Sequence, residues 1–97
     1  MIQVEHVAWQ VHDPVAVARW YCEVLGFRVL RKLDQVPFTH FLADAAGRVV
    51  LEIYHNPAAK VLDYPNLHPL QLHLAFAVED PAATRDAFDR RADGLPA

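Results

Sequence analysis

Residues 6–16, HVAWQVHDPVA, recur without gaps as residues 73–83, HLAFAVEDPAA, and this internal repeat decides the fold. Each copy opens with a histidine, carries an aromatic residue three positions later and closes on an Asp-Pro pair. The first residues of each copy alternate as in a β-strand. Aspartate is a preferred helix N-cap, and proline suits the first helical position because no N–H is needed there. Both copies therefore predict a strand followed by a helix.

The residues between the two copies complete one structural module. Gly26 follows the first predicted helix and is expected to end it in the left-handed conformation. Three strand candidates come next, over residues 27–33, 38–44 and 48–54. The Ala-Gly pair at residues 46–47 indicates a tight hairpin between the last two strands. The element order predicted for this part is β-α-β-β-β.

We expect a single α+β domain over residues 1–97, with a complete βαβββ module in 1–56 and a proline-containing linker in 57–70. Residues 71–97 are then a partial second module, a strand and a helix ending near Gly94. A second module equal to the first needs three more strands, which we expect from a longer reading frame or from another chain. A ferredoxin-like sandwich also mixes strands with two helices, but it does not require the repeat.

Three polar residues share one face of their predicted strands: His6, Glu52, and His73 in the strand over residues 71–78. Side chains alternate along a strand, and the opposite face of each strand is more continuously apolar, so we expect helices to cover that opposite face. A glutamate among aliphatic residues is costly to bury unless it is paired or bound to metal. We therefore predict that these three side chains bind one divalent transition metal. Two imidazoles and a carboxylate suit Zn, Ni, Fe, Co or Mn.

Each of these residues also has a simpler interpretation. A lone strand histidine is usually hydrogen-bonded and half-exposed, and a lone glutamate usually lies on a solvated sheet face. The repeat-related placement of two histidines is what favours a metal site. Of the other histidines, His12 and His68 are expected to face solvent. His40 and His55 are weaker candidates, and His55 is a possible substrate contact.

Composition narrows the functional classes. Hydrophobic residues make up 54% and charged residues 22% of the 97 residues, as in ordinary globular domains. A net charge of −3 without a basic cluster argues against nucleic acid as a partner. The sequence shows no signal-peptide pattern and no apolar run of the roughly 20 residues that a membrane span needs. We therefore predict no association with a membrane. The single Cys22 cannot form an internal disulfide, so we expect a cytoplasmic protein.

At these residues the chain resembles the vicinal-oxygen-chelate superfamily, which includes glyoxalase I, extradiol dioxygenases and bleomycin-resistance proteins. The likeness rests on His6, on residues 20–27 (WYCEVLGF) at the helix end, on Glu52 and on His73. It covers nearly the whole chain and is strongest for glyoxalase I. The helix-end pattern is typical of the fold, whereas the His, Glu, His trio is more specific to metal-binding members.

The resemblance implies a metal-dependent lyase or isomerase acting on a small vicinal-dioxygen substrate, either an α-hydroxycarbonyl or a hemithioacetal. The metal would chelate adjacent oxygens as a Lewis acid, and Glu52 would move a proton α to a carbonyl. The resemblance also implies substrate contacts from Gln10, Tyr54 and Asn56. Glyoxalase I usually has an arginine at the position of Gln10, whereas Asn56 matches a position that contacts glutathione. The fourth metal ligand of the family, a second glutamate, would lie beyond Ala97.

Two other functions compete with this one. A non-catalytic protein that binds a small molecule, or a degenerate fragment of the family, fits a partial second module. An extradiol-type dioxygenase also uses two histidines and a glutamate, but in that group the glutamate comes from the final strand. In either of the two folds considered, we expect a homodimer, because a partial sheet leaves unpaired edges that a second chain can cover.

Overall fold

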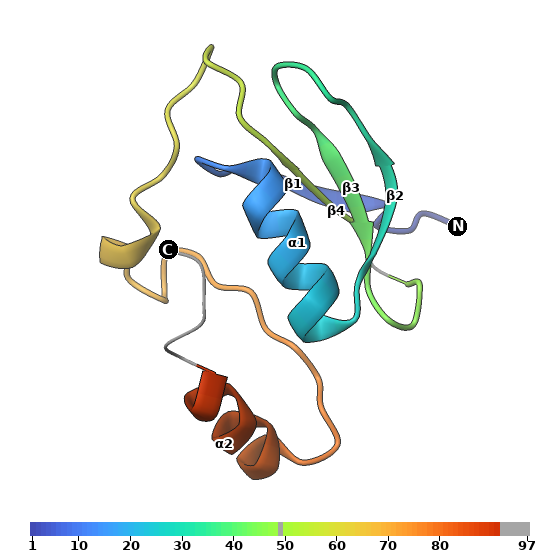
Figure 1. Ribbon diagram of the computed structural model, residues 1–97, viewed down its shortest axis with the longest axis vertical. Helices are drawn as coiled ribbons and strands as arrows, with labels where there is room; N and C mark the ends of the chain where they lie inside the picture. The colour runs from blue at the N-terminus through green and yellow to red at the C-terminus, as the bar shows by residue number, and fades with distance from the viewer. Residues whose placement is uncertain (49, 92–97) are drawn as a thin grey trace. The chain divides into compact units, whose positions relative to one another are not determined.

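The computed structural model describes residues 1–48 and 50–91 and shows an α+β protein. The chain divides into two compact units, Met1–Leu62 and Asp63–Ala97. The elements of the first unit follow the order predicted from the sequence (Figure 1): β1 (His6–Gln10), α1 (Pro14–Leu25), β2 (Arg28–Lys32), β3 (His40–Ala43) and β4 (Val50–Tyr54). The predicted βαβββ module is thereby confirmed.

The first helix begins and ends where the sequence predicted. The Asp13 Oδ1 atom accepts a hydrogen bond from the Ala16 N–H at 3.1 Å, and Pro14 occupies the first turn. At the other end Gly26 has φ of 71°, and its N–H donates to the Tyr21 carbonyl. A residue with a Cβ is strained in this conformation, which is the physical reason for glycine at the helix end.

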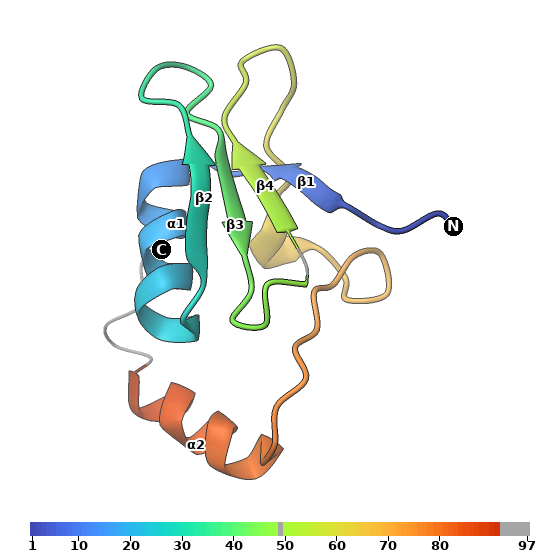
Figure 2. The same ribbon diagram turned by 90° about the vertical axis from the view of Figure 1, so that its right-hand side faces the viewer.

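The four strands form one mixed sheet in the order β1-β4-β3-β2. Strands β1 and β4 are parallel, whereas β4, β3 and β2 are antiparallel neighbours. Figure 2 shows the strands side by side, with α1 behind them. Strand alternation predicted the side on which Val11, Leu51 and Ile53 are buried. The core lies between α1 and the sheet and consists of Val11, Ala18, Leu42, Leu51 and Ile53.

A tight turn joins β3 to β4 at the predicted hairpin. The Gly47 N–H donates to the Asp44 carbonyl at 2.9 Å, and Gly47 has φ of 71°. The Asp44 side chain accepts a further hydrogen bond from the Arg48 N–H at 2.8 Å. This turn fixes the register in which Leu42 pairs with Leu51, so both side chains reach the core together.

The second unit contains a short 3-10 helix, η1 (Tyr64–Asn66), and the helix α2 (Pro81–Arg91). Asp80 caps α2 as predicted, because its Oδ1 atom accepts a hydrogen bond from the Ala83 N–H at 3.0 Å. The predicted end of this helix near Gly94 lies outside the described residues. Among the described residues, no helix is both long enough and apolar enough to cross a membrane.

The strand predicted over residues 71–78 is wrong for the chain as it stands, since this segment forms no strand. A strand persists by exchanging backbone hydrogen bonds with a neighbour. The described part of the second unit, residues 63–91, offers no second strand for it to pair with. The apolar side chains of the segment are accordingly exposed by 43–47% each: Leu72, Leu74, Phe76 and Val78.

Candidate metal site

Two of the three predicted ligands meet on the sheet face opposite α1. In the parallel register Glu52 is the partner of Ala8, and His6 lies two residues before Ala8 on the same face. The His6 Nε2 atom is 3.5 Å from the Glu52 Oε1 atom. Their side chains are 36% and 21% exposed, so both are reachable from solvent while partly enclosed. The small side chain of Ala8 leaves room next to the pair.

The separation of these two atoms has a chemical meaning. Ligand atoms bound to one tetrahedral metal ion at 2.0–2.1 Å lie about 3.4 Å apart. A distance of 3.5 Å between imidazole nitrogen and carboxylate oxygen therefore suits shared coordination. The same distance also suits an ion pair with a protonated imidazole, which at this exposure contributes little to stability.

The orientation of the His6 ring favours the metal interpretation. The Nδ1 atom of His6 lies 2.9 Å from Oε1 of Glu5. A carboxylate only accepts hydrogen bonds, so in a neutral ring Nδ1 holds the proton and Nε2 keeps its lone pair. Metal-binding histidines are commonly oriented by an acceptor on the second ring nitrogen. In that neutral form, Nε2 is the ring nitrogen on the side where Glu52 lies.

His73, in the second unit, is held in the same way. Its Nδ1 atom lies 2.8 Å from the Pro69 carbonyl oxygen, which also only accepts. The Nε2 atom of an exposed His73 is therefore the nitrogen left for a ligand. Both members of the sequence repeat use Nδ1 for a protein contact and keep Nε2 available.

The structure brings His6 and Glu52 together, and His73 belongs to the other unit. Among the described residues, no group of three His, Cys, Asp or Glu side chains lies close enough to hold a metal ion. The donor set nevertheless fits a divalent transition metal. One imidazole and one carboxylate have the spacing of shared ligands, and the role of His73 as a third ligand is a proposal.

Two of the predicted substrate contacts make hydrogen bonds within the protein. The Gln10 side chain is 8% exposed, and its Nε2 atom donates to the Ala59 and Lys60 carbonyls at 2.6 and 3.2 Å. Its Oε1 atom accepts a hydrogen bond from the Asn56 N–H. The Asn56 Oδ1 atom in turn accepts from the Ala58 N–H at 2.9 Å. Both amides therefore hold the loop that follows β4.

The third predicted contact, Tyr54, ends β4 and is half-buried. It is the register partner of Gln10 and lies two residues beyond Glu52, hence on the same face of β4. This position keeps Tyr54 a candidate contact for a molecule bound at the His6–Glu52 pair.

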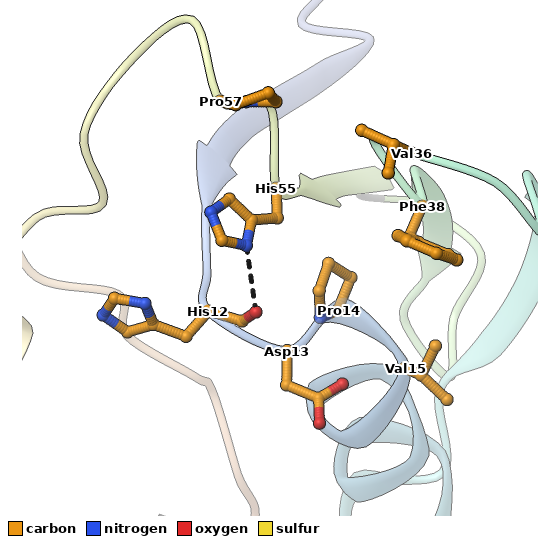
Figure 3. Close-up of a pocket in the computed structure, with 8 residues that line it drawn as sticks. All are labelled: His12, Asp13, Pro14, Val15, Val36, Phe38, His55 and Pro57. Carbon is orange, nitrogen blue, oxygen red and sulfur yellow. Dashed lines mark hydrogen bonds between the residues drawn. The ribbon is translucent and has the colours of Figure 1, made fainter.

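A separate cavity of about 350 Å³ opens at the N-terminus of α1 (Figure 3). The Nδ1 atom of His55 donates to the His12 carbonyl at 3.1 Å across this region. The remaining walls are largely apolar, and the residues that line the cavity come from three segments: His12, Asp13, Pro14, Val15, Val36, Phe38, His55 and Pro57. His55, which the sequence offered as a possible substrate contact, therefore lies at a pocket.

His40 is buried, at 4% exposure, on the face that α1 covers. Its Nδ1 atom lies 2.7 Å from the Phe38 carbonyl. This hydrogen bond satisfies one ring nitrogen inside the core, which is the usual role of a buried strand histidine. His40 accordingly supports the fold at the start of β3.

Phe41 and Arg31 also lie near the candidate site, and the alternation of polar and apolar residues in the sequence could not identify them. The Phe41 ring is 6.0 Å from the His6 ring, centroid to centroid, in an edge-on arrangement. The Arg31 guanidinium carbon lies 4.5 Å from the centroid of the same Phe41 ring. Phe41 is the register partner of both Glu52 and Arg31, so all three side chains line one row across the sheet.

A family model agrees with this fold. The model described as Glyoxalase/Bleomycin resistance protein/Dioxygenase superfamily matches residues 3–93, nearly the whole chain. The chain therefore belongs to this superfamily. No curated protein and no solved structure matches it significantly. Because the superfamily joins enzymes of different reactions with resistance proteins, the activity has to be argued from the site itself.

Proposed function

We propose that the chain is a metal-dependent lyase or isomerase of glyoxalase type that acts on a small vicinal-dioxygen substrate. The observation that carries this proposal is the 3.5 Å separation of the His6 Nε2 and Glu52 Oε1 atoms on the open sheet face. The ring orientation of His73, the repeat-mate of His6, supports it. The substrate class is an α-hydroxycarbonyl or hemithioacetal, whose adjacent oxygens can chelate one cation.

In this proposal His6, Glu52 and His73 hold one ion of Zn, Ni, Fe, Co or Mn. When bound, the metal supplies Lewis-acid polarisation of two neighbouring substrate oxygens. The histidines contribute neutral nitrogens, because Glu5 and the Pro69 carbonyl occupy their other ring positions. These acceptors set the direction in which each imidazole binds.

The Glu52 carboxylate is the group we assign to proton transfer. Its half-buried position beside the Phe41 ring limits the water that competes for the carboxylate oxygens. A carboxylate in such a place can take a proton from the carbon α to a carbonyl and return it to the neighbouring carbon. Ala8, its partner in β1, leaves space for the substrate to approach.

The likeness to glyoxalase I is part of this proposal, but glutathione is not. Gln10 stands where glyoxalase I usually offers an arginine, and its amide holds the loop after β4. The Asn56 side chain is used in the same loop. These contacts favour a substrate without a glutathione moiety.

A second candidate function is the binding of a small molecule without turnover. The 350 Å³ cavity between His55 and Phe38 favours it, because its walls are largely apolar and it is separate from the His6–Glu52 pair. Such a pocket can bury an apolar ligand while the His55 side chain contacts a polar edge. This function needs no metal.

Metal binding by the purified, untagged chain separates the two functions. We expect about one equivalent of Ni²⁺ or Zn²⁺ per chain after reconstitution and dialysis, measured by elemental analysis, because three donors converge in the proposal. His6→Ala, Glu52→Gln and His73→Ala should each weaken the affinity at least about tenfold in calorimetric titrations.

The matched control is His12→Ala, which removes an exposed imidazole outside the proposed ligand set. It should bind metal as the unchanged chain does. Metal content below about a tenth of an equivalent after reconstitution would overturn the proposal and favour simple ligand binding. An equal loss of affinity in His12→Ala would show adventitious surface binding.

A further inference from the structure

An irregularity in β2 changes which face of the sheet Arg31 occupies. The β2–β3 register pairs Val29 with Leu42 and then Arg31 with Phe41, so Leu30 is an extra residue. Strict alternation would place Arg31 on the side of Val29, the side that α1 covers. The bulge turns Arg31 instead to the open face, where Phe41 and Glu52 lie. Bulges of this kind commonly redirect a side chain beside a functional site.

The redirected guanidinium is held next to the candidate metal ligands. Its carbon lies 4.5 Å from the Phe41 ring centroid, a cation–π contact. The His6 ring lies 6.0 Å from that same centroid, and Glu52 is the β4 partner of Phe41. One aromatic side chain therefore contacts the cation and one of the two paired ligands.

Arg31 has no carboxylate partner in the described part of the chain. The ion pairs found there join His6 to Glu5 and to Glu52, and Lys32 to Asp34. A contact with the face of an aromatic ring leaves the N–H groups at the edge of the guanidinium plane available as donors. The planar guanidinium matches the two oxygens of a carboxylate better than the ammonium group of a lysine does.

We propose that Arg31 is the specificity-determining residue for an anionic substrate, and that it binds a carboxylate of the molecule whose vicinal oxygens meet at His6 and Glu52. This inference rests on the proposed function. Strand β3 lies between β2 and β4, so Arg31 and Glu52 are two strand spacings apart, about 10 Å across the sheet. The substrate is therefore a compact molecule with the dioxygen group at one end and the carboxylate at the other.

The positive charge of Arg31 is significant for an anionic substrate because the chain is acidic overall. A net charge of −3 repels an anion in general, so attraction has to be local. Arg28 lies on the same face of β2, but its guanidinium lies beside the Gly47 turn. Arg28 thus provides a matched comparison, since it has the same charge and the same strand but a different place on the sheet.

Two isosteric probes test the inference on the full chain reconstituted with Zn²⁺. The probe 3,4-dihydroxybenzoate carries vicinal oxygens and a carboxylate, and 3,4-dihydroxybenzamide replaces the carboxylate with a neutral amide. We expect the acid to bind the unchanged protein at least about tenfold more tightly than the amide in calorimetric titrations, as a charge-assisted bidentate pair requires. Arg31→Gln should abolish this ratio and leave the affinity for the amide unchanged.

The control variants decide how the result is interpreted. Arg28→Gln should keep the full preference for the acid, and Arg31→Lys should keep part of it. A preference that survives Arg31→Gln, or that falls equally in Arg28→Gln, overturns the assignment of Arg31 while metal binding stands. A chain that binds no Zn²⁺, and neither probe, overturns the proposed function together with this inference. Circular dichroism of Arg31→Gln confirms that the exposed substitution leaves the fold intact.

Discussion

The two copies of the repeat start from nearly the same sequence and reach different structures. Residues 6–16 form a hydrogen-bonded strand and a capped helix, whereas residues 73–83 form only the start of a capped helix. The aspartate cap is local and appears in both copies, with N–H to Oδ1 distances of 3.1 and 3.0 Å. The strand needs a partner and appears only in the copy that has one. A helix cap thus forms from residues close together in the sequence, whereas a strand forms only where a neighbouring strand can pair with it.

Burial follows the same division between the copies. In the first unit Leu42 and Ile53 are fully buried between the sheet and α1. In the second unit Leu74 is 44% exposed, and the α2 residues Ala87 and Phe88 are half-buried. We therefore expect the first unit to carry most of the stability of the chain. Substitutions in each unit can test this difference in burial.

The largest effect is expected in the core of the first unit. Leu42→Ala should lower the free energy of unfolding by about 2–5 kcal/mol, because it removes a fully buried side chain and leaves a cavity. Urea denaturation followed by tryptophan fluorescence measures this change. The control Val15→Ala, on the exposed side of α1, should change it by less than about 0.5 kcal/mol. Equal effects of the two substitutions would show that the core lies elsewhere.

A smaller effect is expected at the exposed apolar row of residues 72–78. We expect a homodimer, because β1 is an edge strand with β4 as its one neighbour in the described sheet, and because this row forms no strand within the described part of its own unit. Leu74→Glu should raise the dimer dissociation constant at least about tenfold, as measured by light scattering over a range of concentrations. Leu70→Glu, at a neighbouring and more exposed position, should leave dimerisation unchanged. A monodisperse monomer at micromolar concentration contradicts the expectation.

The smallest effects are expected at the helix caps. Asp13→Ala should cost about 1 kcal/mol of global stability, because α1 is packed on the core and its cap contributes to the cooperative fold. Asp80→Ala should cost less globally and should mainly speed amide exchange in α2, whose apolar residues are only half-buried. Hydrogen exchange resolved by segment compares the two. Equal protection loss in both helices would mean that the two units unfold as one.

The sequence predicted the fold of the first unit closely. Gly26, the Asp-Pro pairs and the hairpin at residues 46–47 act through local backbone chemistry, so they can be recognised without a structure. The alternation in the strands placed Leu51 and Glu52 on opposite faces, as observed. Alternation is reliable there because, within the described part of the first unit, α1 covers one face of the sheet.

The candidate site was predicted in part. Parity brought His6 and Glu52 to one face, and the structure places their ligand atoms 3.5 Å apart. The role of His73 as a third ligand stays a prediction. The structural use of Gln10 could not be foreseen, because the loop carbonyls it binds lie far away in sequence. The face that Arg31 occupies could not be foreseen either. It depends on the bulge in β2, which arises only when β2 pairs with β3.

By itself the sequence determined the helix caps, the turn glycines and the side of each strand that seeks the core, since each depends on residues close together in the chain. Tertiary structure decided whether a strand pattern becomes a strand, how close His6 comes to Glu52 and which face receives Arg31. These outcomes depend on hydrogen bonds between segments distant in sequence. A pattern of side chains specifies what a strand can offer, but only the neighbouring strand fixes its register.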